Sequence, residues 1–207
     1  MKTAILWLSL LWLMALPLMG QDNPKLEVFG GYQFQDIGGN LGWQMGNPYN
    51  GWDASATYNI NQHFGVQGDF SGSYHHGSYA ATPEVAAEPY HTTIYTFAAG
   101  PVFNFDSKGK IKPFVHALIG GAHINTPVVW GGGGIADTYG SKSGLAMMFG
   151  GGADFKYKKN MALRLVQFDW IIYNSSSMGD LIGAEGRSDS SIFASNVRIS
   201  TGIVFHF

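Results

Sequence analysis

The sequence contains no cysteine, which excludes disulfide frameworks, thiolate metal sites and cysteine nucleophiles. Charge is also scarce, because Asp, Glu, Lys and Arg make up 13% of the 207 residues, whereas roughly 25% is usual in soluble domains. The formal net charge of −2 offers no basic surface for nucleic acid. Glycine (29 residues), phenylalanine (14) and tyrosine (10) are instead abundant. This composition favours a single domain whose surface faces something other than water.

The first 20 residues have the charge, length and position of a secretory signal peptide. Lys2 gives a positive start, residues 4–16 form an apolar run, and Pro17 ends that run. The alternative, an N-terminal membrane anchor, is disfavoured because the run is shorter than the ~20 residues that a helical span needs. We therefore expect cleavage after Gly20 and one mature domain over residues 21–207.

Beyond Gln21 the dominant pattern has a period of two, which is typical of strands with two unlike faces. The clearest segment alternates Phe64, Val66, Phe70 and Tyr74 with Gly65, Gln67, Asp69, Ser71 and Ser73. Segments 26–35, 52–59, 95–105, 147–157 and 193–207 follow the same rule, and segment 111–124 does so less regularly. In segment 162–173, Arg164 is out of phase with Gln167 and Asp169, which predicts a β-bulge at Leu165 and Val166.

Long and short connections alternate between the eight predicted strands. The long ones cover residues 37–50, 75–89, 125–143 and 174–191, and the short ones cover residues 59–62, 106–110 and 158–160. Brief turns at one end and long loops at the other are the plan of outer-membrane barrels. We therefore expect the four long connections to lie on the extracellular side.

The polar faces consist mainly of small residues, which suit the narrow lumen of an eight-stranded barrel. Buried charges are costly unless they are paired, and these faces carry both signs. They predict an interior charge network of Glu27, Asp53, Asp69, Asp154, Lys156, Arg164, Asp169 and Arg198. Aromatic residues near the segment ends predict interfacial girdles: Tyr32, Phe34, Trp52, Tyr58, Tyr74, Tyr95, Phe105, Tyr157, Trp170 and Tyr173. The alternative is a soluble lipocalin-like carrier of small apolar ligands, with its apolar face inside.

The last strand, Asn-Val-Arg-Ile-Ser-Thr-Gly-Ile-Val-Phe-His-Phe, resembles that of the small outer-membrane β-barrel family, which includes the transmembrane domain of outer membrane protein A. The resemblance covers the mature chain and implies an eight-stranded antiparallel up-and-down transmembrane β-barrel in the outer membrane. It also implies that Ile203, Phe205 and Phe207 are read by the barrel assembly machinery. The sequence shows no peptidoglycan-binding domain after the barrel, so we do not expect a role in tethering the membrane to the cell wall.

Two chemical alternatives involve histidines. His75, His76 and His91 are imidazole donors for a metal, but they lack a fixed ligand spacing. Ser73 or Ser78 beside His75 and His76 would suit a lipid A-modifying enzyme, with Asp69 on the same strand, but no His-x-Ser-Asn motif is present.

We therefore expect a scaffold without catalysis, metal or cofactor, which presents its four long loops for a structural or surface-interaction role. Outer-membrane lipids and an extracellular ligand at the loops are the expected partners.

Overall fold

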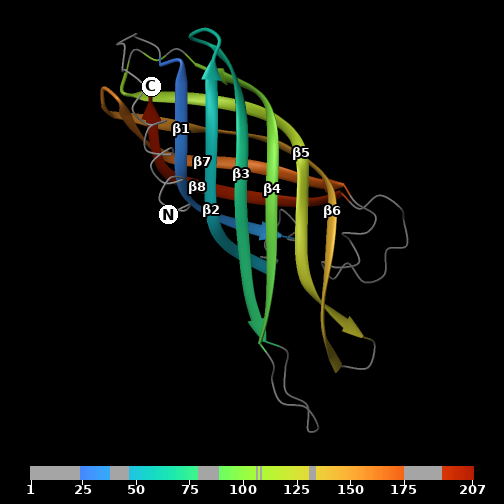
Figure 1. Ribbon diagram of the computed structural model, residues 1–207. Helices are drawn as coiled ribbons and strands as arrows, with labels where there is room; N and C mark the ends of the chain where they lie inside the picture. The colour runs from blue at the N-terminus through green and yellow to red at the C-terminus, as the bar shows by residue number, and fades with distance from the viewer. Residues whose placement is uncertain are drawn as a thin grey trace, which may run out of the picture.

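The computed structural model describes residues 24–37, 47–78, 89–105, 107, 109–130, 134–174 and 193–207. The predicted signal segment 1–20 and most of the long connections 37–50, 75–89 and 174–191 lie outside these ranges. Eight strands follow in order (Figure 1): β1 (Leu26–Ile37), β2 (Asn47–Asn59), β3 (Phe64–Ser78), β4 (Pro89–Asn104), β5 (Ile111–Trp130), β6 (Gly134–Lys158), β7 (Met161–Asn174) and β8 (Phe193–His206). No helix in the described part is long and apolar enough to cross a membrane.

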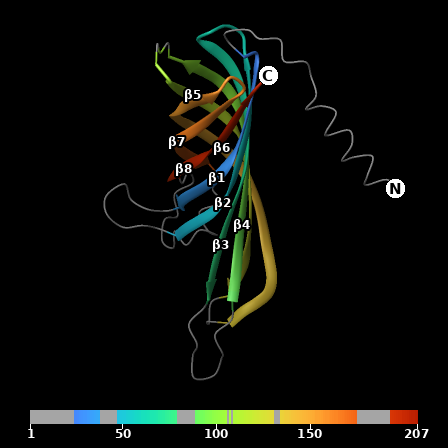
Figure 2. The same cartoon turned by 90° about the vertical axis from the view of Figure 1, so that its left-hand side faces the viewer.

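The strands form one closed antiparallel barrel, in which each strand pairs with its neighbours in sequence and β8 pairs with β1. The closure extends to the last residue, because the amide nitrogens of Leu26 and Phe207 each donate to the other's carbonyl oxygen, at 3.3 and 2.8 Å. The predicted fold is confirmed. The short turns and the C-terminus lie at one end, and β3 to β6 reach furthest at the other end (Figures 1 and 2).

Neighbouring residues on each strand point to opposite sides of the barrel wall, as the period of two predicts. On β4, Phe97 is 57% exposed whereas Ala98 is 6% exposed. Most of the large aromatic side chains on the other strands, such as Tyr58, Phe149 and Phe168, face outward in the same way. This finding contradicts the lipocalin-like alternative, because a carrier of that kind would turn these aromatic rings toward a central cavity.

The bulge predicted in β7 is present. Arg164 pairs with Gly202 of β8, and the next paired residue is Gln167, opposite Ser200, so two residues of β7 oppose one of β8. Leu165 and Val166 are consecutive, yet both face outward, at 51% and 48% exposed. The extra residue brings the side chains on both sides of the bulge into the lumen.

Two sequence interpretations are wrong. Residues 125–143 were predicted to form a loop because they are rich in glycine and interrupted by proline, but β5 continues to Trp130 and β6 begins at Gly134. These ends pair with each other beyond their neighbouring strands, with a register irregularity at Pro127. Tyr173 was assigned to an outer girdle because it is near a strand end, but it faces inward and is 2% exposed.

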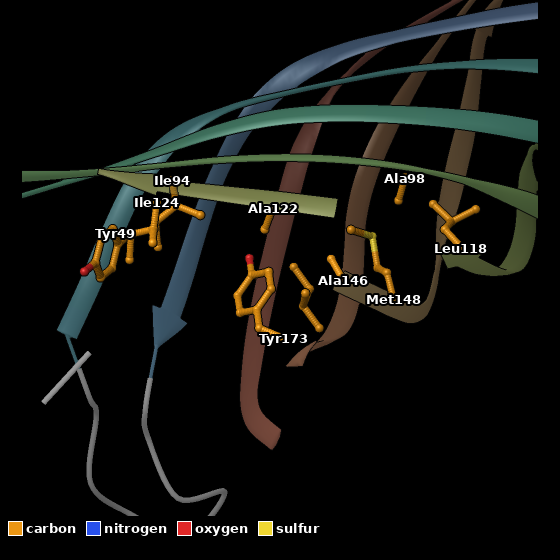
Figure 3. Close-up of a cluster of buried hydrophobic side chains, with 10 residues drawn as sticks. Tyr49, Ile94, Ala98, Leu118, Ala122, Ile124, Ala146, Met148 and Tyr173 are labelled. Atoms are coloured by element: carbon orange, nitrogen blue, oxygen red, sulfur yellow. The ribbon is translucent and has the colours of Figure 1, made fainter. Parts of the chain in front are cut away.

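The half of the lumen toward the long connections contains an apolar cluster beside the buried polar side chains of Gln33, Gln35, Ser73 and Thr96. The cluster consists of side chains from β2, β4, β5, β6 and β7: Tyr49, Ile94, Ala98, Leu118, Ala122, Ile124, Ala146, Met148, Ile171 and Tyr173. Figure 3 shows these side chains gathered between the strands. The sequence analysis did not predict this cluster, and the polar residues of the lumen lie mostly on its short-turn side.

Candidate functional site

Arg198 of β8 lies at the centre of the lumen and is fully buried. Its guanidinium nitrogens lie 2.7 Å from an oxygen of Asp169 on the neighbouring strand β7 and 3.1 Å from an oxygen of Asp69 on β3. A third carboxylate, that of Asp53 on β2, lies 3.7 Å away. Because the guanidinium presents five donors in a fixed plane, one arginine can join several strands across the barrel.

Asp169 connects this centre to the other wall of the lumen. One of its oxygens lies 2.7 Å from Nε2 of His116 on β5, and the other accepts from the amide of Gln167 at 2.7 Å. The second imidazole nitrogen, Nδ1, faces the Gln67 Oε1 at 3.2 Å. The period of two places His116 inward, but no sequence pattern predicts that it contacts Asp169.

Arg164 extends the same chain of contacts toward the short-turn end. It donates to both oxygens of Asp154, at 2.8 and 3.0 Å, and to Oε1 of Gln167 at 2.7 Å. Its guanidinium also lies between the rings of Phe29 and Phe114, 4.4 and 4.3 Å from their centroids. Cation–π contact with both ring faces stabilises the buried cation. We call Asp53, Asp69, His116, Asp154, Arg164, Gln167, Asp169 and Arg198 the lumenal network.

Glycines make room for the lumenal network. A Cβ atom at Gly150 would collide with the Asp169 carboxylate, and one at Gly202 would lie 2.9 Å from the ring of Phe29. An eight-stranded lumen is narrow, so the large side chains of the network fit only where the facing positions are bare. The abundance of glycine in the sequence therefore has a packing cause at these positions.

The lumenal network contains more acidic than basic side chains. Four aspartates face two arginines and His116. Asp53 has the weakest contacts, because neither of its carboxylate oxygens has a hydrogen-bond partner in the described part of the chain. A buried carboxylate depends on nearby positive charge, so Asp53 depends on Arg198 for compensation.

A second series of hydrogen-bonded polar side chains crosses the lumen beside the apolar cluster. Gln33 donates to the Ser73 hydroxyl at 2.7 Å, and Ser73 donates to Gln35 at 2.8 Å. Gln35 donates to the Tyr173 hydroxyl at 2.9 Å, which lies 3.2 Å from that of Thr96. These contacts satisfy the buried hydroxyl of Tyr173, which explains why a tyrosine occupies an inward position.

Two residues predicted for the interior charges lie apart from this centre. Glu27 is buried at the short-turn end, where it accepts a 3.0 Å hydrogen bond from Asn59. Lys156 is exposed near the end of β6, so the structure does not bring it into the lumenal network. The other six predicted residues, Asp53, Asp69, Asp154, Arg164, Asp169 and Arg198, come together.

The predicted catalytic alternative is not assembled. Ser73 faces the lumen, where it is bonded to two glutamines, whereas His76 is exposed on the opposite face of the same strand. His75 contacts the carbonyl oxygen of Pro48 at 2.8 Å, and the side chain of Ser78 lies outside the described ones. Activation of a serine needs a base within hydrogen-bond reach, and His76 does not provide one for Ser73.

The histidines of the metal alternative also spread over both faces. His76 of β3 pairs in register with His91 of β4 on the outer face, and His75 lies on the other face of β3. Within the described residues, no group of three His, Cys, Asp or Glu side chains is arranged to hold a metal ion.

The last strand places the three residues of the predicted assembly signal at the short-turn end of the barrel. Ile203 and Phe205 are exposed on the outer face of β8, and Phe207 follows the strand. They form an apolar edge that is continuous with the outer surface.

Comparisons with known proteins agree with this architecture. A family model described as the outer membrane protein beta-barrel domain matches residues 4–203. Among solved structures, the chain is similar to Neisserial surface protein A (15% identity, TM-score 0.60, covering 88% of this chain and 97% of the other). It is also similar to Ail, the attachment invasion locus protein of Yersinia pestis, in complex with the heparin analogue sucrose octasulfate (15% identity, TM-score 0.53, covering 89% and 99%). No curated protein matches.

Proposed function

Because the chain belongs to the outer membrane protein β-barrel family, we propose that it is a non-catalytic scaffold that holds three long connections and the extended β5–β6 hairpin at the cell surface. The filled lumen is the observation that carries this proposal. Arg198, Tyr173 and Met148 are among its largest fully buried side chains, and the lumenal network meets the apolar cluster where Arg198 contacts the Met148 sulfur. A filled lumen favours the role of a rigid scaffold for loops over that of a pore.

The charge of the long connections favours some ligands over others. The connections 37–50, 75–89 and 174–191 and the β5–β6 segment 125–143 together contain six acidic residues and two basic ones. Ail has been solved with a sulfated heparin analogue, but an acidic surface repels such a polyanion. We infer that the ligand of this chain, at the same end of the barrel, is cationic or uncharged.

In this proposal, two segments of the sequence direct export and assembly. Residues 1–20 act as a signal peptide that is removed after Gly20, and the barrel assembly machinery reads Ile203, Phe205 and Phe207. The exposed apolar edge at the end of β8 supports the second role. Truncation of Phe207 should lower the yield of inserted barrel in cells, whereas refolding of the purified variant into detergent should be unchanged.

The test of the scaffold role is surface display. An epitope inserted between Ala81 and Thr82, in the connection after β3, should be detected by antibody on intact cells and removed by external protease. The same epitope inserted at Gly109, in the turn before β5, should be reached only after the outer membrane is opened. Detection of both epitopes on intact cells, or of neither, would contradict the orientation. A change in lipid A mass that depends on expression would contradict the non-catalytic role.

A further inference from the structure

The outer wall of the barrel carries a groove of about 640 Å³ that the scaffold role does not use. Small residues form its floor: Ala56 of β2 pairs with Gly68 of β3, which pairs with Ala99 of β4. Phe70 and Phe97, paired in the next row, form a wall along one side. We call this feature the outer groove.

The bare floor of the outer groove is not required by the fold. At most of the described glycines, an added Cβ would strike a neighbouring atom, but at Gly68 it would meet nothing within 4 Å. The same holds for Gly30, which pairs with Ala54 at the edge of the groove. Glycine weakens a strand interior, so these two positions keep space open at a cost in stability. We therefore expect a molecule other than this chain to fill that space.

The depth of the outer groove in the membrane shows which part of the bilayer surrounds it. Gly68 is four positions from Phe64, the first residue of β3, so at about 3.3 Å per residue and a tilt of about 40° it lies about 10 Å from the strand end. The outward apolar band of such barrels is about 25 Å tall, which places the floor in the hydrocarbon, in the half toward the short turns. Lipid headgroups do not reach this depth.

We propose that the outer groove binds one acyl chain of a phospholipid from the periplasmic leaflet. The floor residues offer no polar side chain for a peptide or headgroup, and the Phe70 and Phe97 rings offer flat apolar faces against which methylene groups pack. A bound chain fills the space that Gly30 and Gly68 leave open. The outer face of β6 to β8 carries larger side chains, among them Phe149, Phe168 and Trp170, and serves as the comparison.

Photolabelling tests this proposal on the folded full-length mature chain. The barrel is reconstituted in vesicles of phosphatidylethanolamine and phosphatidylglycerol that contain a phosphatidylcholine with a diazirine in its acyl chain. Adducts are then located by mass spectrometry. We expect several-fold more adducts on β2, β3 and β4 than on the outer face of β6 to β8. Filling the groove by Ala99→Leu should remove this excess.

A matched control separates the groove from general effects of bulk. Ala153→Leu makes the same change on the outer side of β6, away from the groove, and should leave the labelling excess intact. Gly68→Ala adds only a methyl group in open space, so it keeps the test available if Ala99→Leu does not fold, and it should lower the excess. Equal labelling of both faces, an excess that persists in the filled variants, or photolinks between two copies at the groove would overturn the proposal.

Discussion

Arg198 and Asp69 are 129 positions apart in the sequence, yet the guanidinium of one donates two hydrogen bonds to the carboxylate of the other, at 3.1 and 3.2 Å, across the lumen. These bonds join β8 to β3, which are not neighbours in the sheet. The backbone ladder closes the wall of the barrel, and this pair connects opposite parts of that wall through the interior.

Replacement of Arg198 by Met should lower the free energy of unfolding by about 3–5 kcal/mol, because three buried aspartates lose their common cation. Asp69→Asn should cost less, because Arg198 retains Asp169 and Asp53. Urea unfolding in lipid vesicles, followed by the different gel migration of folded and unfolded barrel, measures both changes. Equal stability of the wild type and Arg198→Met would contradict the role of this residue.

The β7 bulge should be indispensable for Arg164. Deletion of Val166 removes the extra residue and turns Arg164 toward the outer face, which leaves Asp154 buried without its cation and places an arginine on the lipid-facing side, where it is destabilising. The deletion variant should therefore fail to give the heat-sensitive folded band on gels. Val166→Ala keeps the residue count and should fold normally. A folded deletion variant with wild-type stability would refute this explanation of the bulge.

The stacking of Arg164 between two rings predicts a smaller effect. Phe114→Leu should destabilise the barrel by about 1–2 kcal/mol, since one cation–π contact of a desolvated guanidinium is lost. Phe149→Leu, on the outer face of β6, makes the same change without touching an arginine and should cost less. A double-mutant cycle of Phe114→Leu with Arg164→Met isolates the contact, and a coupling free energy of zero would argue against it.

The filled lumen predicts a lack of conductance. Purified barrel in planar bilayers should show no stepwise current, because the lumenal network and the apolar cluster together fill the interior. Ile94→Gly combined with Ile124→Gly thins the apolar cluster and serves as the comparison. Regular channel openings by the wild-type chain would contradict a closed scaffold.

The sequence predicts the wall of this barrel better than its interior. Alternation fixes which side of each strand Phe97 and Ala98 occupy, and phase alone locates the bulge beside Arg164. Contacts across the lumen depend instead on barrel closure and stagger, which no local pattern encodes. For that reason the contact of His116 with Asp169 was not foreseen, and Tyr173 was assigned to the wrong side because proximity to a strand end says nothing about its phase.

Ends of strands are equally hard to predict. Beyond the barrel wall, β5 and β6 need only pair with each other, so they keep no alternation of apolar and polar residues, and glycine and proline do not end them. Lys156 shows a related effect at the other end, because it pairs with Ala162 of β7 in the wall, yet its position near the end of the strand leaves its side chain exposed.

Spin labelling on β4 tests most directly whether the apolar side of each strand faces lipid. The chain has no native cysteine, so Phe97→Cys gives a single attachment site for a nitroxide in reconstituted barrels. We predict frequent collisions of the label with oxygen, which concentrates in hydrocarbon, and few with a water-soluble nickel complex. A label that is shielded from oxygen, or that meets the nickel complex more often, would place this face in a cavity or in water and contradict the account.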